Sequence, residues 1–552
     1  MKIKPAPVTA LPLHAAFQAN APRASWRTTP WQSVAVHGGV LLTWALAVLA
    51  AFGLGGVWAW SSGLAYVVYD TVLLTFTAIA TWQLVRGAHA SIDAGRPLAS
   101  SVNLTGTTST ESGTSTQQTL RVGVIIAARN EATVLAATIA GLQAQSRVPD
   151  VVLLADDGSD DGTAHLLTQT FRLQPLAAGA PADAPLCWLR LPHGGKARAL
   201  NAALPLLTVD VLLTIDADTL LEPHAIQAML AAFQSNPHLV AATGVIRPVC
   251  GQTLQGRVLE WFQTYEYIRN FLSRYAWMRA DGLLLISGAF AGFRRTALLQ
   301  VGGFDPDCLV EDYELIHRLR RFSVLHGLHW TTAVVGGAYA CTEAPGTLAA
   351  FVRQRKRWFG GFLQTQYWYR DMVGNARYGA LGTRMLVVKA IDTLQPLFGL
   401  TALAIALTHL VRGDWRVVVP VAGVISAKIL VDLGFHLWSV HVYRCWLGPQ
   451  AARLPRFSHA LLAALAEPFS FQILRHVSAT AGWWVFLAGR RQWGAQHRVA
   501  GALRRVTTSP AASISAANPS HKGESSAESA TTVTALKQPG NNGGSGPIQH
   551  RR

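Results

Sequence analysis

Four apolar stretches, each long enough to cross a bilayer as a helix, constrain this chain more than any other feature. Two lie early, at 34–52 and 64–85, and two lie late, at 394–411 and 417–440. A bilayer core takes about 20 consecutive apolar residues in a helix. Half of the 552 residues are hydrophobic and 14% are charged, which is too apolar for an ordinary soluble enzyme. We therefore expect a membrane hairpin at 33–86, with a buried hairpin of a soluble fold as the alternative, and a second membrane region at 379–500.

Charge and cysteine content favour a membrane protein with a cytosolic domain. The net charge is +17, but the basic residues cluster beside the apolar stretches, as the positive-inside effect and anionic lipid explain, so we expect no nucleic-acid partner. Basic residues flank the first hairpin on both sides (Lys2, Lys4, Arg23, Arg27, Arg86, Arg96). The five cysteines show no CxxC or metal-ligand spacing and indicate reduced thiols. Both flanks of the hairpin, and the domain that follows it, are predicted to be cytosolic.

The segment 457–487 fits a membrane crossing less well. Glu467, Pro468, Arg475 and His476 interrupt its apolar pattern. A full crossing would also place the basic run after residue 489 outside the cell, against the charge rule. We therefore favour a re-entrant or interfacial segment here.

Between the two apolar regions the hydrophobic period changes. Short apolar runs at 122–127, 151–154, 188–191, 211–215 and 239–245 alternate with helical patterns at 131–145, 196–206 and 223–233. This alternation predicts an α/β domain at 121–345 whose mostly parallel sheet is covered on both faces, with its ligand at the loops after the strands. A cytosolic N-terminal segment (1–32) and a Ser/Thr-rich linker (87–120) are expected before it. Interfacial helices (346–378) and a disordered tail (501–552) are expected after it.

Two carboxylates follow one of the predicted strands. Asp216 and Asp218 come after the apolar run 211–215, at the edge where α/β sheets bind ligands. Two nearby carboxylates repel each other unless a cation lies between them, and oxygen ligands suit Mg²⁺ or Mn²⁺ carrying a diphosphate. A solvated acidic turn is the alternative.

Polar groups follow three other predicted strands. Asp156 and Asp157 precede a glycine, where acids can accept hydrogen bonds from a nucleobase or ribose, and Arg129 and Glu131 hold the same position after the preceding strand. Lys196 follows two glycines at a predicted helix start, where backbone N–H groups and an ammonium attract an anion. Each motif also fits an ordinary strand-to-helix loop.

Two further motifs lie on predicted helices. Glu311 and Asp312 open an amphipathic helix, whose N-terminus keeps a carboxylate ionised, as a general base for a sugar hydroxyl requires. In the string 354–358, QRKRW, Arg357 suits a leaving diphosphate and Trp358 offers a flat face to a sugar ring. The alternatives are a helix cap for the first motif and a basic helix on the membrane surface for the second.

Together these motifs resemble the D, D, D, QxxRW pattern of membrane-embedded family-2 glycosyltransferases, the group of the cellulose, hyaluronan and poly-N-acetylglucosamine synthases. The resemblance implies a GT-A-type nucleotide-sugar domain inserted between N-terminal and C-terminal transmembrane helices. It implies nucleotide-sugar binding by Arg129, Glu131, Asp156, Asp157, Lys196, Asp216, Gln354 and Arg357. It further implies Mg²⁺ or Mn²⁺ at Asp216 and Asp218, catalysis by Asp312 with Glu311, and acceptor binding by Trp358, Ser287 and Gly288.

The function implied by the resemblance is inverting transfer of a hexosyl or N-acetylhexosaminyl group from a UDP-sugar to a growing β-linked polysaccharide at the inner membrane. Its partners would be the donor, the acceptor, membrane lipids and accessory biosynthesis or export proteins. Transfer of a single sugar to a lipid acceptor and a catalytically inactive nucleotide-binding scaffold are the alternatives. Two departures from the family stand out: no regulatory β-barrel domain follows the last span, and the later spans are few.

One intramembrane pair is predicted as well. Lys428 and Asp432 lie four residues apart on one apolar stretch, so a helix brings them to the same face. They could line a polar path for a saccharide or pair for structural reasons alone. Asp70 stands alone in the second stretch and has no assigned role.

Overall fold

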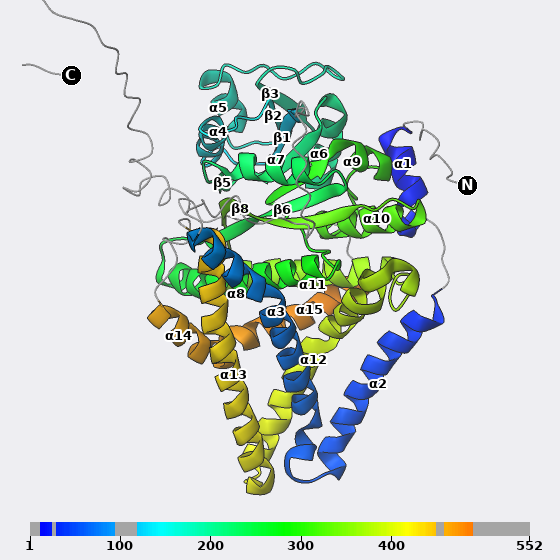
Figure 1. Ribbon diagram of the computed structural model, residues 1–552, viewed down its shortest axis with the longest axis vertical. Coiled ribbons are helices and arrows are strands. Elements are labelled where there is room, and N and C mark those ends of the chain that lie inside the picture. The colour runs from blue at the N-terminus through cyan, green and yellow to red at the C-terminus, as the bar shows by residue number, and fades with distance from the viewer. Residues whose placement is uncertain (1–10, 25–28, 94–118, 449–456, 490–552) are drawn as a thin grey trace, which may run out of the picture. The chain divides into compact units, whose positions relative to one another are not determined.

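The computed structural model describes residues 11–24, 29–93, 119–448 and 457–489. Its centre is one eight-stranded sheet in the order β3-β2-β1-β4-β7-β6-β8-β5 (Figure 1). The first four of these strands are mutually parallel, β6 pairs in parallel with β8, and β7 and β5 run antiparallel to their neighbours. The strands are β1 (Val122–Ala128), β2 (Val151–Asp157), β3 (Leu186–Leu191), β4 (Val211–Asp216), β5 (Thr219–Leu221), β6 (Leu239–Val249), β7 (Phe290–Arg294) and β8 (Thr331–Glu343).

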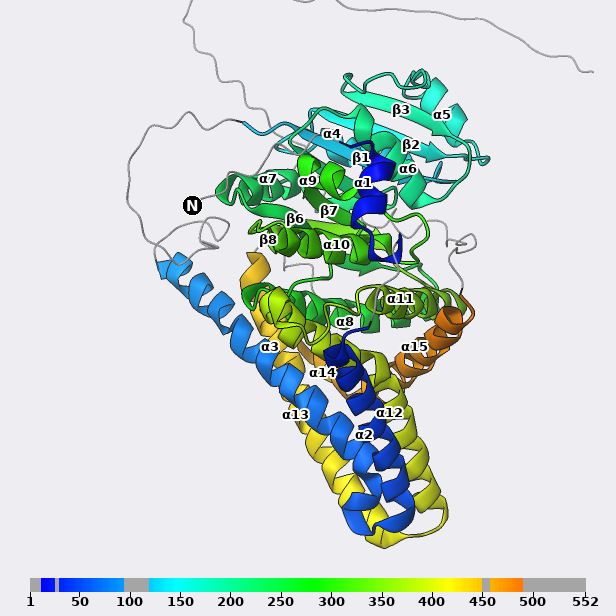
Figure 2. The ribbon, with the colours of Figure 1, turned by 90° about the vertical axis from the view of Figure 1, so that its right-hand side faces the viewer.

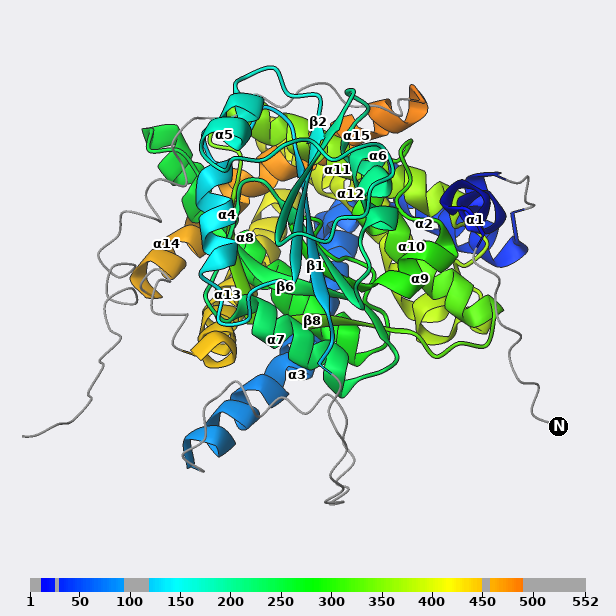
Figure 3. The ribbon, with the colours of Figure 1, turned by 90° about the horizontal axis from the view of Figure 1, so that it is seen from above.

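Helices cover both faces of the sheet, as the continuous apolar runs of its strands require. Neighbouring residues of β1 show the two faces: Val124 packs into the cluster of α4 (Leu135–Gln143) and α7 (Ala225–Ser235), whereas Ile125 packs into that of α6 (Lys196–Ala203), α9 (Arg295–Val301) and α10 (Glu311–Leu325). Figure 3 shows these two groups on opposite sides of β1. The short α5 (Thr163–Gln169) follows β2.

The predicted strands are all present, and several elements are additional. Strands β5, β7 and β8 and the long α8 (Leu254–Arg279) were not predicted from the sequence. Asp156 and Asp157 were expected after a strand, whereas β2 continues through both. The helix expected at 131–145 begins only at Leu135, because Asn130 has a φ of 60° and a turn precedes the helix.

Four helices of the described residues are long and apolar enough to cross a membrane: Trp31–Gly53, Gly56–Arg86, Leu381–Val411 and Trp415–Leu447. They comprise α2 (Trp31–Gly53), much of α3 (Ser61–Asp93), α12 (Leu386–Val411) and α13 (Trp415–Leu447). Phe52, Val72 and Leu430 are among the large apolar side chains that they leave exposed. Exposure of this kind suits contact with lipid, and Figure 2 shows these helices running together.

The segment 457–489 contains a bent helix pair. Phe457–Phe469 and Phe471–Leu487 meet at 49°, the geometry of a broken span or of a re-entrant loop. It comprises α14 (Phe457–Ala466) and α15 (Phe471–Leu487), and α15 packs along α11 (Leu348–Trp368), the helix that carries QRKRW. The preference for a re-entrant segment therefore stays a prediction, because both alternatives share this geometry.

The N-terminal segment contains a helix, α1 (Leu13–Asn20), that packs against α9 of the sheet domain. Sequence reasoning treated 1–32 as a segment of its own. In the structure, Ala16, Phe17 and Ala21 are buried. The predicted tail, 501–552, and most of the predicted linker, 94–118, lie outside the described residues.

Candidate active site

A single cavity of about 1350 Å³ connects the ends of the strands with the helices that flank the sheet domain. Its walls include the predicted site residues Arg129, Glu131, Asp157, Lys196, Asp216, Asp218, Ser287, Gly288, Glu311, Asp312, Gln354, Arg357 and Trp358. The structure therefore brings together residues that lie up to 229 positions apart in the sequence, from Arg129 to Trp358. Only Asp156 of the predicted set does not line the cavity.

The carboxylates Asp216 and Asp218 lie where β4 ends. Asp216 is the last residue of β4 and pairs with Ala127 of β1, which pairs in turn with Ala155 of β2, so the three strands end together. Asp218 is almost completely buried in the turn before β5, and its Oδ1 accepts a hydrogen bond from Thr342 Oγ1 at 3.2 Å. Both side chains reach the cavity, as predicted for strand ends.

Lys196 supplies positive charge beside these acids. Its ammonium forms an ion pair with Asp216 and lies 3.8 Å from Glu311 Oε1. Burial alone would lower the pKa of Lys196, but Asp216 and Glu311 outweigh it, so the pKa is raised and the side chain stays charged. A cationic group held between the β4 acid and the α10 acid fits a site for a polyanionic substrate.

The glycine loop before Lys196 is organised by Asp157. The backbone N–H groups of Gly194 and Gly195 donate to Asp157 Oδ1 at 2.7 and 3.1 Å, and His193 Nδ1 lies 2.8 Å from Asp157 Oδ2. The expectation that these amides receive a phosphate is wrong for this conformation, because Asp157 already accepts from them. Asp157 thus fixes the loop that leads into Lys196, while His193 Nε2 lies 2.7 Å from Arg129 Nη1.

Asp156 lies behind the cavity wall. Its side chain is fully buried, Oδ1 accepts from Ser159 N at 2.9 Å, and Oδ2 has no hydrogen-bond partner. A buried carboxylate oxygen without a donor is costly. The direct nucleotide contact predicted for Asp156 stays a prediction, and in this conformation the residue shapes the turn after β2.

Asp312 is held at the cavity wall by the loop before β7. Its Oδ2 accepts from the backbone N–H of Gly288 at 2.8 Å, and its Oδ1 accepts from Tyr313 N at 2.8 Å. A Cβ on residue 288 would lie 3.0 Å from Asp312 Oδ2, so only glycine allows this approach without displacement. Burial raises the pKa of the neighbouring Glu311, against the attraction of Lys196. Two adjacent acids on one helix thus sit in different environments.

The QRKRW string faces the cavity from α11. Arg357 Nη1 donates to Leu309 O at 3.1 Å, in the loop before Asp312, and its Nε has no partner. The Arg355 guanidinium lies 4.4 Å from the centre of the Trp358 ring and donates to Glu266 Oε2 at 2.7 Å. Gln354 Oε1 is buried without a partner. One turn of α11 therefore offers an unsatisfied acceptor, an unsatisfied donor and an aromatic face to the same cavity.

Sequence reasoning missed the contribution of α8. Glu266, Arg269, Asn270 and Arg274 of this helix all line the cavity. Burial lowers the pKa of Arg274 to about 10, and its Nε and Nη1 have no hydrogen-bond partner. Their spacing of three, four and eight residues from Glu266 indicates one helix face, which a search for strand-end acids does not register.

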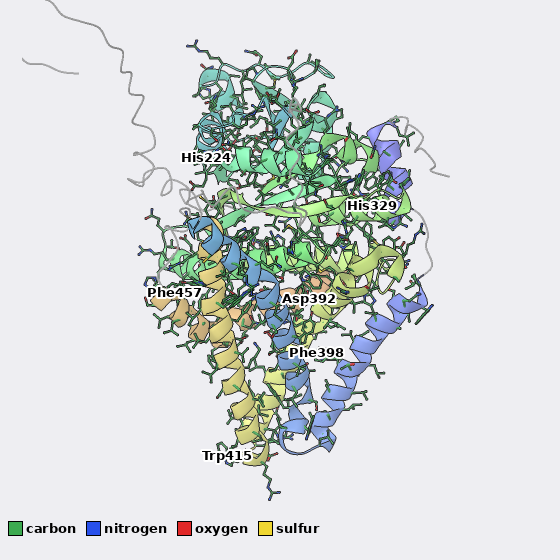
Figure 4. All side chains as sticks on the ribbon, in the orientation of Figure 1. His224, His329, Asp392, Phe398, Trp415 and Phe457 are labelled. Carbon is green, nitrogen blue, oxygen red and sulfur yellow. The ribbon has the colours of Figure 1, made fainter. Side chains whose placement is uncertain are left out.

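The cavity continues between the apolar helices. Lys428 forms the predicted ion pair with Asp432 and also contacts Asp70 at 2.7 Å, which gives the isolated acid a partner. Asp392 of α12 accepts from Lys389 Nζ at 2.7 Å, and it lies toward the sheet domain in Figure 4, far from Trp415. The cavity is lined by all five of these charged residues, Asp70, Lys389, Asp392, Lys428 and Asp432. The pairing predicted for Lys428 is therefore confirmed.

The acids suit a divalent cation only in part. No group of three His, Cys, Asp or Glu side chains with metal-binding geometry occurs among the described residues. Asp216 and Asp218 still present hard oxygen donors, and Asp216 already attracts a cation in the form of Lys196. These residues fit a metal whose other ligands come from a diphosphate and water, as Mg²⁺ sites commonly show. The five cysteines are free thiols, and four of them are buried.

Comparisons with known proteins place the sheet domain beside a known family. Residues 120–361 match the family model described as "Glycosyltransferase like family 2". A poly-beta-1,6-N-acetyl-D-glucosamine synthase of Staphylococcus epidermidis is 26% identical over 252 residues, covering 44% of this chain and 55% of the relative. The Staphylococcus aureus (strain COL) protein of that name is 27% identical over 240 residues, covering 43% and 53%. The chain thus spans about half the length of the curated relatives it matches.

Among solved structures, a mannosyltransferase from Pyrobaculum calidifontis, PcManGT in complex with GDP-Man and Mn²⁺, matches with a TM-score of 0.45 and 20% identity. The match covers 74% of this chain and 99% of that one. The predicted GT-A-like α/β domain, flanked by helices apolar enough to span a membrane, is confirmed by the family match together with the observed mixed sheet. Residues 120–361, about two fifths of the chain, are therefore similar to glycosyltransferase family 2 domains.

Proposed function

We propose that this protein transfers a sugar from a UDP-sugar to a growing β-linked polysaccharide, by one displacement that inverts the anomeric carbon. The observation that carries the proposal is the placement of Asp312. Its carboxylate is fixed by the Gly288 amide at the wall of the cavity that also contains Lys196, Arg357 and the β4 acids. A general base must lie within hydrogen-bond reach of the hydroxyl that it deprotonates, and a rigid amide contact holds it there.

Each side chain has a distinct part in the proposed reaction. The acceptor hydroxyl lies between Asp312 and the sugar of the donor, and it attacks the anomeric carbon as its proton passes to an Asp312 carboxylate oxygen. The bond from the anomeric carbon to the diphosphate breaks on the opposite side. Lys196 and Arg357 attract the negative charge that develops on the diphosphate, which is more valuable in the transition state than in the ground state. Trp358 holds the acceptor sugar against its ring.

A divalent cation belongs to the proposed donor site. Asp216 and Asp218 would hold Mg²⁺ or Mn²⁺, with the diphosphate supplying further oxygens. When bound, such an ion neutralises phosphate charge as the nucleotide departs. Within the chain itself, Asp157 holds the His193–Gly195 loop in place and thereby aims Lys196 at the same phosphates.

The polysaccharide product and the membrane location rest on two further observations. The curated relatives are named as poly-beta-1,6-N-acetyl-D-glucosamine synthases, which favours an N-acetylhexosamine donor. The cavity also extends from the catalytic groups to Asp70, Asp392 and Lys428 between apolar helices, which suits a hydroxyl-rich chain leaving the site. We place the protein in the inner membrane as a multi-pass enzyme with a cytosolic catalytic domain, on the basis of its flanking basic residues. Accessory proteins would complete export.

The test is Asp312→Asn in purified membranes, supplied in turn with a panel of UDP-sugars and Mg²⁺ or Mn²⁺. Asparagine keeps the shape of the side chain but cannot take the proton, so we expect transfer to fall by about 10²-fold or more while UDP binding changes little. Product mass separates a polymer from a single-sugar adduct on lipid, and the linkage reports inversion. Transfer near the wild-type rate, or an α-linked product from an α-linked donor, would contradict the mechanism.

A further inference from the structure

The N-terminal arm, which we define as residues 11–24, docks beside the catalytic helix. It comprises α1 and the short 3-10 turn Pro22–Ala24. Phe17 is buried, and the backbone of Gly302, which has a φ of 87°, comes so close that a Cβ there would lie 2.1 Å from Phe17 N. Asn20 Nδ2 donates to Gln300 O at 3.1 Å. The arm thus rests on the end of α9, where the chain turns toward Asp312.

Arg23 joins the arm to the loop between α9 and α10, residues 302–310. Its Nε and Nη2 donate to both oxygens of Asp305, at 2.6 and 2.7 Å, and Nη2 lies 3.0 Å from Asp307 Oδ2. Asp305 is fully buried, and its Oδ1 also accepts from Asp307 N at 2.9 Å. A two-pronged contact to a buried carboxylate fixes direction as well as distance. The position of this loop therefore depends on an arginine about 280 residues earlier in the chain.

The same loop receives contacts from two other parts of the active site. Asn201, on the helix that Lys196 opens, accepts from Phe304 N and donates to Phe304 O, both at 2.7 Å. From α11, Arg357 Nη1 donates to Leu309 O at 3.1 Å, and Gln364 Oε1 accepts from Leu309 N at 3.2 Å. Helix α10 begins directly after Leu309 and Val310, and Glu311 and Asp312 are its first two residues. The loop therefore links the three helices that carry Lys196, Arg357 and Asp312.

The arm also contacts α10 and α11 directly. The Phe17 ring lies 4.7 Å from the guanidinium of Arg318, which forms a buried ion pair with Glu314 at 2.7 Å. The guanidinium of Arg23 lies 5.7 Å from the Trp368 ring at the end of α11. Cation–π contacts of this kind add to the stability of the docked arm.

We propose that the N-terminal arm is required for the activity of the site. Arg23 holds Asp305 and thereby positions the loop 302–310, which orients Asp312 and binds Arg357. Arg23 does not touch substrate in this assignment, so it is a positioning residue. The proposal rests on the proposed role of Asp312 as the base. It makes transfer depend on a segment that lies before the first apolar helix and outside the matched family domain.

The ion pair gives this role a pH signature. Asp305 faces the charged or titratable groups of Arg23, Asp307, Cys308, Glu314, Arg318 and Tyr369. Burial and the charge of Glu314 raise the pKa of Asp305, and Arg23 opposes that rise. Without Arg23 an ionised Asp305 is left buried and without its cation, and protonation at lower pH removes that penalty. The defect of an Arg23→Gln variant should therefore be greatest at high pH and shrink as the pH falls.

The experiment compares full-length variants in proteoliposomes, measuring initial rates of transfer from a UDP-sugar between pH 6 and pH 9 together with UDP binding. For Arg23→Gln we expect kcat to fall about tenfold or more, in line with sub-ångström displacement of a catalytic group, with KM for the donor within about twofold of wild type. Arg23→Lys should restore part of kcat. Gln18→Ala, on the exposed face of α1 in the same arm, is the matched control and should be unchanged.

The double variant Arg23→Gln/Asp305→Asn keeps the test informative if the single variant unfolds. Removal of both charges should return thermal stability toward wild type and abolish the pH dependence of the defect. A kcat within twofold of wild type in Arg23→Gln, or an equal loss of kcat and UDP binding at every pH, would overturn the proposal. If Asp312→Asn is active, the proposed role of Asp312 as the base is refuted. If Asp312→Asn is inactive while Arg23→Gln behaves as wild type, only the proposed role of the arm is refuted.

Discussion

Substitution of Gly288 by alanine tests whether the position of the Asp312 carboxylate matters, without removing any group of the proposed mechanism. The new Cβ would lie 3.0 Å from Asp312 Oδ2, 3.3 Å from its Cβ and 3.4 Å from its Cγ. Since ordinary contact begins near 3.4 Å, the carboxylate must move by about 0.4 Å. A misplacement of about 1 Å costs on the order of 10²-fold in rate, so we expect kcat to fall about tenfold. The variant keeps the backbone carbonyl of residue 288, which accepts from Lys196 Nζ at 3.5 Å, and adds no atom beside Arg357, so KM for the donor should stay close to the wild-type value.

The assay is the rate of UDP release and of sugar incorporation in purified membranes, with thermal unfolding of each variant measured beside it. Gly141→Ala is the control, because a Cβ at that position of α4 meets nothing within 4 Å and alanine favours a helix by up to about 1 kcal/mol. In an Asp312→Asn background, Gly288→Ala should cost little more, because both changes act on one group. A stable Gly288→Ala enzyme with the wild-type kcat would show that the amide contact does not aim the base.

Two further predictions concern the metal and pH. Transfer should stop in excess EDTA and return with Mg²⁺ or Mn²⁺, and Asp218→Asn should abolish turnover in a folded protein, since both carboxylates and the diphosphate need positive charge; full activity in EDTA would contradict this. Burial lowers the pKa of His317 to about 4, so its contribution to stability is complete above its unfolded pKa of 6.5 and is lost progressively as the pH falls from 6.5 to about 4. At pH 4.5 the loss should reach about 2 to 3 kcal/mol, and His317→Phe should flatten the fall in melting temperature; an unchanged pH dependence in that variant would refute the assignment.

The sequence predicted those parts of the fold that follow from local patterns. Strands β1, β2 and β4 are continuous apolar runs, and the strand-end acids Asp216 and Asp218 follow from one of them. Strand β8 escaped notice because Gly336 and Gly337 interrupt its apolar pattern near a register shift in its pairing with β6. Its existence depends on partner strands that lie far away in the sequence, which no local period reports.

The residues of the candidate site could be proposed from the sequence, but the contacts between them could not. The helix start at Asp312 and the string at Arg357 were both visible, yet the amide of Gly288 that holds Asp312 lies 24 residues earlier and carries no side-chain signal. Helix α8 was missed for a related reason. Its buried Glu266 is stabilised by arginines of other helices, so a charged residue occupies a position where an apolar pattern would place a hydrophobic one.

The pairing of Glu266 also limits how this protein can be divided into fragments. Glu266 is almost completely buried, and it forms ion pairs with Arg355 at 2.7 Å and with Arg475 at 3.2 Å, which both come from helices beyond the sheet domain. A soluble fragment that stops at the last strand, β8, would retain the acid and lose both arginines. Such a fragment would lose both ion pairs together with the helices that pack on α8, and it would expose to solvent a helix face that is buried in the whole protein. The sheet domain is therefore held by ion pairs to the helices that follow it, and we expect a stable preparation to need α11 and α15 as well as the sheet.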